Sequence, residues 1–204
     1  MFPLVEVRGT PYEIGFQHGQ AAGKKIDNTI RLYKFVFKNL WGVEWEAAVK
    51  DSSRFVKYVQ DYDTDLVEEM QGVADGADKS FEEILTVNAR SEVIFSGHTL
   101  EGCTSIVLTP EVTASKETII GQNSDWFTMQ KESIIILKIK QEKKPNILMI
   151  TEAGVIGKMG FNSSGLGVCL NGLGSDYKPN GVSYTSCIPR CSKCKNFKWC
   201  YHCC

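Results

Sequence analysis

The feature that most constrains the fold is a change in sequence periodicity at about residue 103. Before it, apolar residues recur at helical intervals, whereas after it short runs of isoleucine, valine and leucine alternate with turn-forming residues. The runs expected to form strands are 105–108, 118–123, 133–139, 147–150, 159–162 and 167–171. Helices followed by a series of strands predict an α+β layered fold.

The first 40 residues predict a strand followed by a helix. Leu4 to Arg8 has strand character, and the helix after it is expected to continue in pieces towards Leu40. Thr10 suits the N-cap, Pro11 suits the first helical position, and Glu13 completes a capping box. This combination predicts that the helix begins at Pro11.

Two further helical stretches precede the change in periodicity. The first is expected from about Trp45 to Val73, because its aromatic and aliphatic residues recur at helical intervals. In the second, Ser80 and Glu83 form another capping box, which predicts a helix through about Arg90 or Val93.

Small residues and one histidine share a face of the first helix. Gly15, Gly19 and Gly23 recur every fourth residue, so we expect another element to approach the helix closely along this face. His18 lies among them. For an isolated histidine on a helix we favour a structural hydrogen bond over a catalytic role.

The Gly102-Cys103 bond carries the functional prediction. A thiol with the ordinary pKa of about 8.5 needs a nearby base to act as a nucleophile at neutral pH. If the bond were cut, the new α-amino group of Cys103, with a pKa of about 7.7–8.0, would provide that base. Glycine leaves its carbonyl uncrowded, and the hydroxyl of Ser105, on the same side of a strand, could relay a proton or hold the amine. From these residues alone, a buried and inert Cys103 side chain is the favoured interpretation.

Other polar residues in the second half each have two interpretations. Asn123-Ser124-Asp125 is either a turn or part of a site, and Asn171 is either a turn residue or a carboxamide that faces the nucleophile. Glu152 and Lys158 flank a glycine turn and are expected to pair at the surface.

Five blocks of the sequence support one family. They are residues 9–19 (GTPYEIGFQHG), 88–92 (NARSE), 102–105 (GCTS), 121–125 (GQNSD) and 150–163 (ITEAGVIGKMGFNS). In these blocks, and in their order from near residue 4 to about Val182, the chain resembles the acyl-coenzyme A:6-aminopenicillanic acid acyltransferase family, also called the C45 peptidase family.

The resemblance implies an amino-terminal-nucleophile hydrolase with an αββα sandwich. It implies self-cleavage between Gly102 and Cys103, followed by acyl-enzyme chemistry, hydrolysis or acyl transfer, on a small amide or thioester. Asp125 is implied to support processing or to orient the amine, and Ser105 stands where the family has threonine or serine. The implied partners are an acyl amide or acyl-CoA-like substrate and the chain's own cleaved subunit, in an αβ heterodimer. No cofactor is expected.

The resemblance also implies that the carboxy-terminal part of the sandwich is missing. The family's chains continue beyond this one, and their later asparagine and arginine at the oxyanion and substrate sites have no counterpart here. We therefore expect three parts: a helical pro-segment or α subunit (1–102), an incomplete β-rich start of the nucleophile subunit (103–182), and a cysteine-rich tail (183–204).

Composition excludes several classes of partner. The net charge of −1 gives no reason to expect nucleic acid or an anionic membrane. The first eight residues include charges where a signal peptide has an apolar core, and no later segment reaches the roughly 18 apolar residues of a membrane span. We therefore expect a cytoplasmic protein.

The tail differs from the rest, because six of the eight cysteines lie after residue 186. Cys191, Cys194, Cys200 and Cys203, with His202, are spaced like zinc ligands. A short metal knuckle, a disulfide knot and translation in a shifted reading frame are all compatible with this pattern, and we favour the last. The alternative function is thus an inactive truncated product or a small zinc-binding module.

Overall fold

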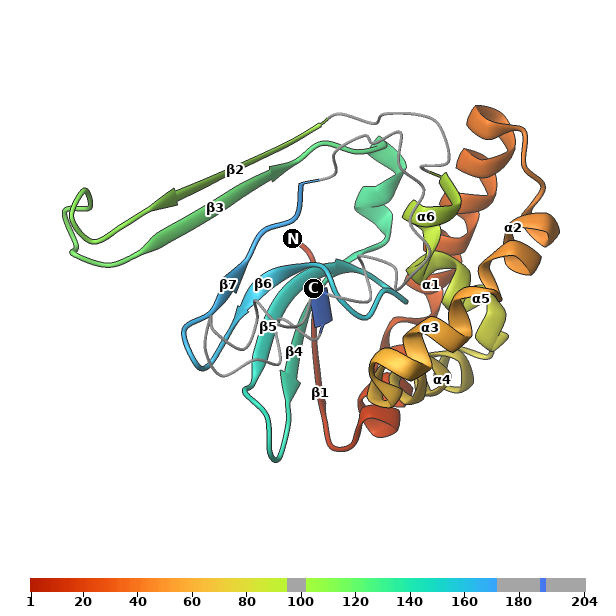
Figure 1. Ribbon diagram of the computed structural model, residues 1–204, viewed down its shortest axis with the longest axis horizontal. Coiled ribbons are helices and arrows are strands. Elements are labelled where there is room, and N and C mark those ends of the chain that lie inside the picture. The colour runs from red at the N-terminus through yellow and green to blue at the C-terminus, as the bar shows by residue number, and fades with distance from the viewer. Residues whose placement is uncertain (95–101, 172–187, 190–204) are drawn as a thin grey trace.

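The computed structural model describes residues 1–94, 102–171 and 188–189. Within these ranges, helices cover one face of a five-stranded sheet and a two-stranded hairpin projects from the body (Figure 1). The expected mixed α+β class is confirmed. The helices are α1 (Pro11–Trp41), α2 (Trp45–Ser52), α3 (Phe55–Tyr62), α4 (Thr64–Ala77), α5 (Phe81–Asn88), α6 (Arg90–Ile94) and the 3-10 helix η1 (Thr128–Glu132). The strands are β1 (Leu4–Arg8), β2 (Cys103–Leu108), β3 (Ile119–Ser124), β4 (Ile134–Lys140), β5 (Ile147–Glu152), β6 (Met159–Asn162) and β7 (Gly167–Val168).

The main sheet combines β1, from the start of the chain, with four strands from the second half. Its strand order is β1-β4-β5-β6-β7, and among the residues that the structure describes β2 pairs only with β3, in a separate sheet. β1 runs parallel to β4, with Val5 opposite Leu137, whereas the other pairs are antiparallel. All six strands predicted after residue 103 are present, the last being shorter than expected. The parallel pairing of β1 with β4 places the first strand of the chain beside the second half.

The start of α1 follows the sequence prediction. The Thr10 hydroxyl accepts a hydrogen bond from the Glu13 N–H (3.3 Å), and the Glu13 carboxylate accepts one from the Thr10 N–H (2.8 Å). These reciprocal bonds satisfy donors that the first turn of a helix leaves free. The helix is continuous rather than in pieces, and it ends at Gly42, whose φ of 66° is left-handed.

The close approach predicted for α1 is made by α4. An ideal Cβ on Gly15 would lie 1.9 Å from the Glu69 carbonyl oxygen, and one on Gly19 would lie 2.4 Å from that of Val73. The prediction is wrong for Gly23, where a Cβ would meet no described atom within 4 Å. The reason is that α4 ends at Ala77, which Gly19 already contacts.

The stretch expected as one helix from Trp45 to Val73 is three helices. α2 ends at Ser52 and α3 ends at Tyr62, and the break before α4 is at Asp63. Asp63 has an extended backbone (φ −162°, ψ 106°), and its side chain accepts a hydrogen bond from the Asp65 N–H (3.1 Å). This aspartate therefore begins α4 as an N-cap.

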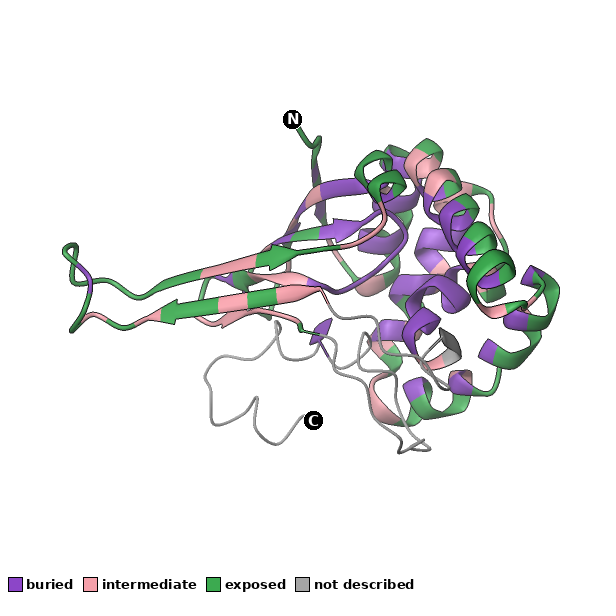
Figure 2. Ribbon diagram, turned by 90° about the horizontal axis from the view of Figure 1, so that it is seen from above, coloured by how far each residue is buried: buried purple, intermediate pink, exposed green. Residues whose placement is uncertain are grey.

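Within the described residues, the helices pack mainly against one face of the main sheet. Alternate residues of β1, β4 and β5 are buried together with residues of the helical layer, and Figure 2 colours the ribbon by this burial. On this face lie Val5, Val7, Ile135, Leu137, Ile139, Ile147 and Met149. On the opposite face, Leu4, Ile150 and Phe161 stay 54%, 42% and 54% exposed. A layered arrangement of helices on sheet is thus observed, while a second sheet on the open face is not part of the described residues.

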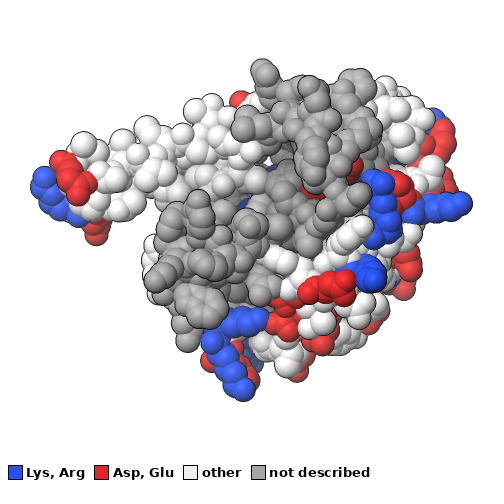
Figure 3. All heavy atoms as spheres, in the orientation of Figure 1, with Lys and Arg blue, Asp and Glu red and all other residues white. Residues whose placement is uncertain are grey.

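The β2–β3 hairpin extends away from the body as a largely apolar arm. Ile106, Val107, Ile119 and Ile120 are all exposed on it. Figure 3 shows the arm as mostly uncharged, with charged side chains gathered at its tip. Its base, by contrast, contacts the body through Gln122 and contains Cys103 and Ser105.

Candidate functional site

The base of the hairpin brings together two of the sequence blocks singled out above. In the antiparallel pair, Cys103 lies opposite Ser124 and Ser105 lies opposite Gln122. Directly opposed residues share a face of a sheet, so all four side chains lie on the same side. Cys103 is a free, half-buried thiol. The strand alternation predicted for Cys103 and Ser105 is therefore present.

Gly102 and Asp125 meet through their backbones. The Asp125 N–H donates a hydrogen bond of 2.7 Å to the Gly102 carbonyl oxygen. An ideal Cβ on Gly102 would lie 3.0 Å from the Asp125 Cβ and 3.1 Å from its carbonyl oxygen, so any larger residue would press on Asp125. The Asp125 side chain is exposed. The structure thus polarises the carbonyl carbon that directly precedes Cys103.

A carboxamide from outside the hairpin completes the cluster. The Ser105 hydroxyl donates a hydrogen bond of 2.7 Å to the Asn171 Oδ1. Gln122 also contacts this segment, because its Oε1 accepts a hydrogen bond of 2.8 Å from the Leu170 N–H and its Nε2 donates to the Leu170 carbonyl. The structure therefore places the Asn171 carboxamide against Ser105, and a role facing the Cys103 thiol stays a prediction. Gln122 was not singled out as a site residue, although its place opposite Ser105 in a hairpin would have indicated it.

Behind the sheet, the turn from Glu152 to Lys158 is buried against the helices. The Gly154 N–H donates a hydrogen bond of 3.1 Å to the His18 Nε2, and burial lowers the pKa of His18 to about 4. Asn88 donates to the Gly154 carbonyl (2.8 Å) and accepts from the Ile156 N–H (3.0 Å). The structural hydrogen bond expected for His18 is confirmed.

The same turn holds a buried ion cluster. Glu152 Oε1 accepts from Arg90 (3.1 Å) and Lys158 (2.8 Å), and its Oε2 accepts from the Tyr33 hydroxyl (2.6 Å). Burial alone would raise the pKa of Glu152, but Arg90 and Lys158 outweigh burial and lower it to about 2. The surface pairing expected for Glu152 and Lys158 is wrong, because both side chains are buried under α1 and α6. The cluster joins both sides of the 102/103 junction.

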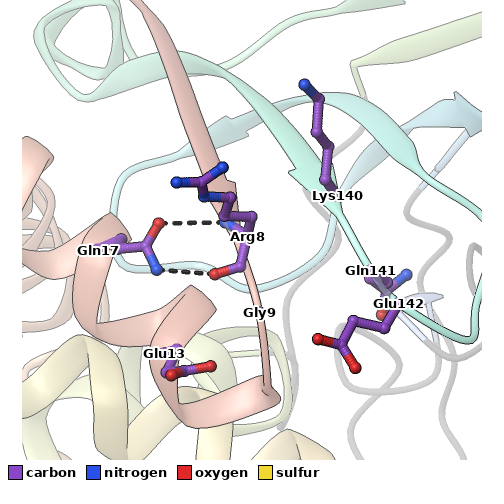
Figure 4. Close-up of a pocket in the computed structure, with 7 residues that line it drawn as sticks. All are labelled: Arg8, Gly9, Glu13, Gln17, Lys140, Gln141 and Glu142. Carbon is purple, nitrogen blue, oxygen red and sulfur yellow. Dashed lines mark hydrogen bonds between the residues drawn. The ribbon is translucent and has the colours of Figure 1, made fainter.

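A separate hollow lies at the carboxyl ends of β1 and β4. It has a volume of about 430 Å³ and is lined by the side chains drawn in Figure 4. On its wall, Gln17 donates to the Arg8 carbonyl (2.7 Å) and accepts from the Arg8 N–H (3.1 Å), as the dashed lines show. The cluster around Cys103 does not line this hollow.

Metal ligands do not gather within residues 1–94, 102–171 and 188–189, where no group of three or more histidine, cysteine or acidic side chains is placed to hold a metal ion. None of the helices in these ranges combines the length and apolar character needed to cross a membrane. The possible zinc ligands Cys191, Cys194, Cys200, His202 and Cys203 lie outside the described residues.

Sequence comparison decides the family. The chain is 38% identical over 177 residues to the acyl-coenzyme A:6-aminopenicillanic-acid-acyltransferase 40 kDa form of Emericella nidulans, an alignment that covers 83% of this chain. The chain belongs to this acyltransferase family. It spans about half, 46%, of the length of the curated relative. No family model matches the sequence.

Proposed function

We propose that this member of the acyltransferase family is a self-processing cysteine-nucleophile enzyme of the amino-terminal-nucleophile class. One observation supports the proposal: the carbonyl of Gly102, the residue directly before Cys103, accepts a 2.7 Å hydrogen bond from the Asp125 N–H. A donor fixed on this oxygen stabilises negative charge that develops there when the carbonyl carbon is attacked. The hydrogen bond from the Asp125 N–H therefore supports cleavage of the peptide bond between Gly102 and Cys103.

The proposed cleavage begins with attack of the Cys103 sulfur on the Gly102 carbonyl carbon. The thiol proton passes to the Cys103 nitrogen as the C–N bond breaks, which gives a thioester and a free α-amine. Water then opens the thioester, leaving a carboxylate on Gly102 and restoring the thiol. The Asp125 N–H holds the oxygen through both tetrahedral intermediates, because each places charge on the same atom.

The new amine of Cys103 is the base for the second reaction. With a pKa near working pH it accepts the thiol proton and returns it to the leaving group. Ser105 lies on the same face of β2, and Asn171 fixes its hydroxyl through the 2.7 Å hydrogen bond. In the cleavage as well as in this second reaction, Ser105 is proposed to hold or relay the proton, and Asp125 is proposed to orient the amine.

The proposed substrate is a small acyl amide or an acyl thioester of the acyl-CoA kind. The name of the relative describes acyl transfer from an acyl-coenzyme A to the amine of 6-aminopenicillanic acid. A thioester or amide carbonyl would acylate Cys103, and an amine or water would then accept the acyl group.

The two cleavage products are proposed to remain together as an αβ heterodimer. Residues 1–102 provide β1, which pairs with β4, and Arg90 and Tyr33, which contact Glu152. Residues 103–182 are proposed as the start of the nucleophile subunit of an αββα sandwich. The apolar face of the main sheet around Ile150 and Phe161, left exposed here, suits packing of a second sheet.

Intact-mass measurement of the purified full chain tests the proposal. We expect two fragments, 1–102 and 103–204, and an uncut chain for Cys103→Ala, because that variant lacks the attacking sulfur. Cys169→Ala is the matched control, since Cys169 is also a free, half-buried cysteine, and it should be cut like the wild type. A folded wild-type chain that stays whole, or a Cys103→Ala chain that is still cut, would contradict self-cleavage.

The acyl-enzyme is tested on the cut protein. Incubation with a short-chain acyl-CoA should add one acyl mass to the 103–204 fragment, and a primary amine should remove it faster than water alone. Acylation elsewhere in the chain would count against Cys103 as the nucleophile.

A further inference from the structure

The carboxamide of Gln122 pairs with the backbone as a neighbouring strand would. Its Oε1 accepts from the Leu170 N–H at 2.8 Å, and its Nε2 donates to the carbonyl of the same residue. A side-chain amide has the same donor and acceptor as a peptide unit, so these two bonds fix both the distance and the orientation of Leu170.

This contact lies where the two sheets meet. In the described part of the chain, β3 and β7 share no ladder of backbone hydrogen bonds. Beside Gln122, the junction has the Cys169 thiol 3.8 Å from the Gly121 carbonyl, and Gly167 against Ile120, whose Cδ1 a Cβ would meet at 3.2 Å. Gln122 thus provides the two-point hydrogen bond that ties the hairpin bearing Cys103 to residues 169–171.

Asn171 directly follows the residue that Gln122 holds. Its Oδ1 accepts the Ser105 hydroxyl at 2.7 Å and lies 3.4 Å from the Gln122 Nε2. Ser105 and Gln122 are opposite each other in the β2–β3 register. A shift of Leu170 would therefore move the Asn171 carboxamide away from the Ser105 hydroxyl.

We propose that Gln122 is a positioning residue that sets Asn171 against Ser105 for the chemistry of Cys103. The inference rests on the proposed function, because it assigns Gln122 a part in the same site. Gln122 acts through the backbone of Leu170. A misplacement of about 1 Å in a catalytic group can cost about 100-fold in rate. The expected effect of losing Gln122 is of this size.

The protein contains a matched control for this contact. Gln17 makes the same two-point hydrogen bond to the Arg8 backbone, on the wall of the hollow in Figure 4. Q17E and Q122E each remove one amide donor and keep the size of the side chain. They differ in that Gln122 lies beside Ser105, whereas Gln17 lies on the wall of a hollow that the Cys103 cluster does not line.

The experiment follows self-cleavage of the full chain by intact mass between pH 5 and pH 8. We expect Q122A to be cut about 100-fold more slowly at every pH and Q17E at the wild-type rate. At pH 8 the carboxylate introduced by Q122E cannot donate to Leu170, so this variant should be as slow as Q122A. At pH 5 a fraction of the carboxyl is protonated, and the ratio of the Q122E rate to the wild-type rate should rise by about tenfold or more.

A second measurement does not depend on activity. Hydrogen exchange of the Leu170 amide should be about tenfold faster in Q122A, because its acceptor is lost, and unchanged in Q17E and Q122E. If Q122A does not fold, Q122E provides the test of the positioning role, because its side chain matches glutamine in size. The readout is then the pH dependence of its cleavage rate relative to the wild type.

The outcomes separate this inference from the proposed function. A wild-type chain that is not cut contradicts the proposed function, and Leu170 exchange then tests Gln122 alone. Wild-type cleavage with an unchanged rate in Q122A and Q122E would overturn the positioning role. The role is also overturned if the rate ratio of Q122E to wild type is flat with pH, or if Leu170 exchange in Q122A equals that of the wild type.

Discussion

Replacing Glu152 by glutamine should destabilise the fold strongly, because it removes the carboxylate that Arg90 and Lys158 share. The pKa of Glu152 falls from 4.5 to about 2 in the folded protein. That difference corresponds to about 3 kcal/mol in favour of the carboxylate in the fold. It agrees with the roughly 3–5 kcal/mol that breaking a buried ion pair costs. For a chain of this size the loss should lower Tm by about 6–12 °C.

The destabilisation depends on pH with a definite sign. A carboxylate whose pKa is lowered by folding contributes stability above its unfolded pKa, and the contribution is lost as pH falls through the folded value. For Glu152 the window runs from about pH 5 down to about pH 2. The difference between wild type and E152Q should therefore shrink from about 3 kcal/mol at pH 7 to about 1 kcal/mol at pH 3.

Urea unfolding of both proteins in a Cys103→Ala background provides the assay, since the background keeps each chain in one piece. E6Q is the control, because the Glu6–Lys138 pair (2.8 Å) is exposed and should contribute far less. A cost for E152Q below about 1 kcal/mol at pH 7, or an equal cost at pH 7 and pH 3, would refute the reasoning.

Two further predictions concern glycines. G102A should slow self-cleavage, measured by intact mass, because the new Cβ would lie 3.0 Å from the Asp125 Cβ and push the N–H donor off the carbonyl; a cleavage rate equal to wild type would count against that donor. G15A should destabilise the protein in urea unfolding, since a Cβ there would lie 1.9 Å from a backbone oxygen of α4. G23A should instead stabilise it by about 0.5–1 kcal/mol, because the position is helical and open. Opposite signs for this pair are expected, and equal effects would contradict the helix contact.

Sequence reasoning located the elements well where the signal is local. The capping boxes at Thr10 and Ser80 are recognisable from residues three apart, and both are present with their reciprocal hydrogen bonds. The strands after residue 103 are predictable because branched aliphatic residues recur between turn-forming residues. Periodicity did not locate the breaks in the helical stretch after Trp45, since apolar spacing continues across Asp63.

Contacts between distant segments were beyond such reasoning. Closeness in sequence predicts that Glu152 pairs with Lys158, but Arg90 and Tyr33 reach the same carboxylate and the whole turn is buried. That burial depends on the packing of α1, α5 and α6 against the turn. Gln122 belongs to a block that indicates the family, and its role depends on Leu170, 48 residues later.

The position of β1 has a consequence for the lifetime of a cut molecule. While the chain is whole, Val5 and Leu137 belong to one polymer, and unfolding can be reversed at any dilution. After a cut at residue 102, the two polymers that share this ladder would have to meet again by diffusion. Refolding would then depend on concentration, so the height of the unfolding barrier would govern how long the processed protein survives.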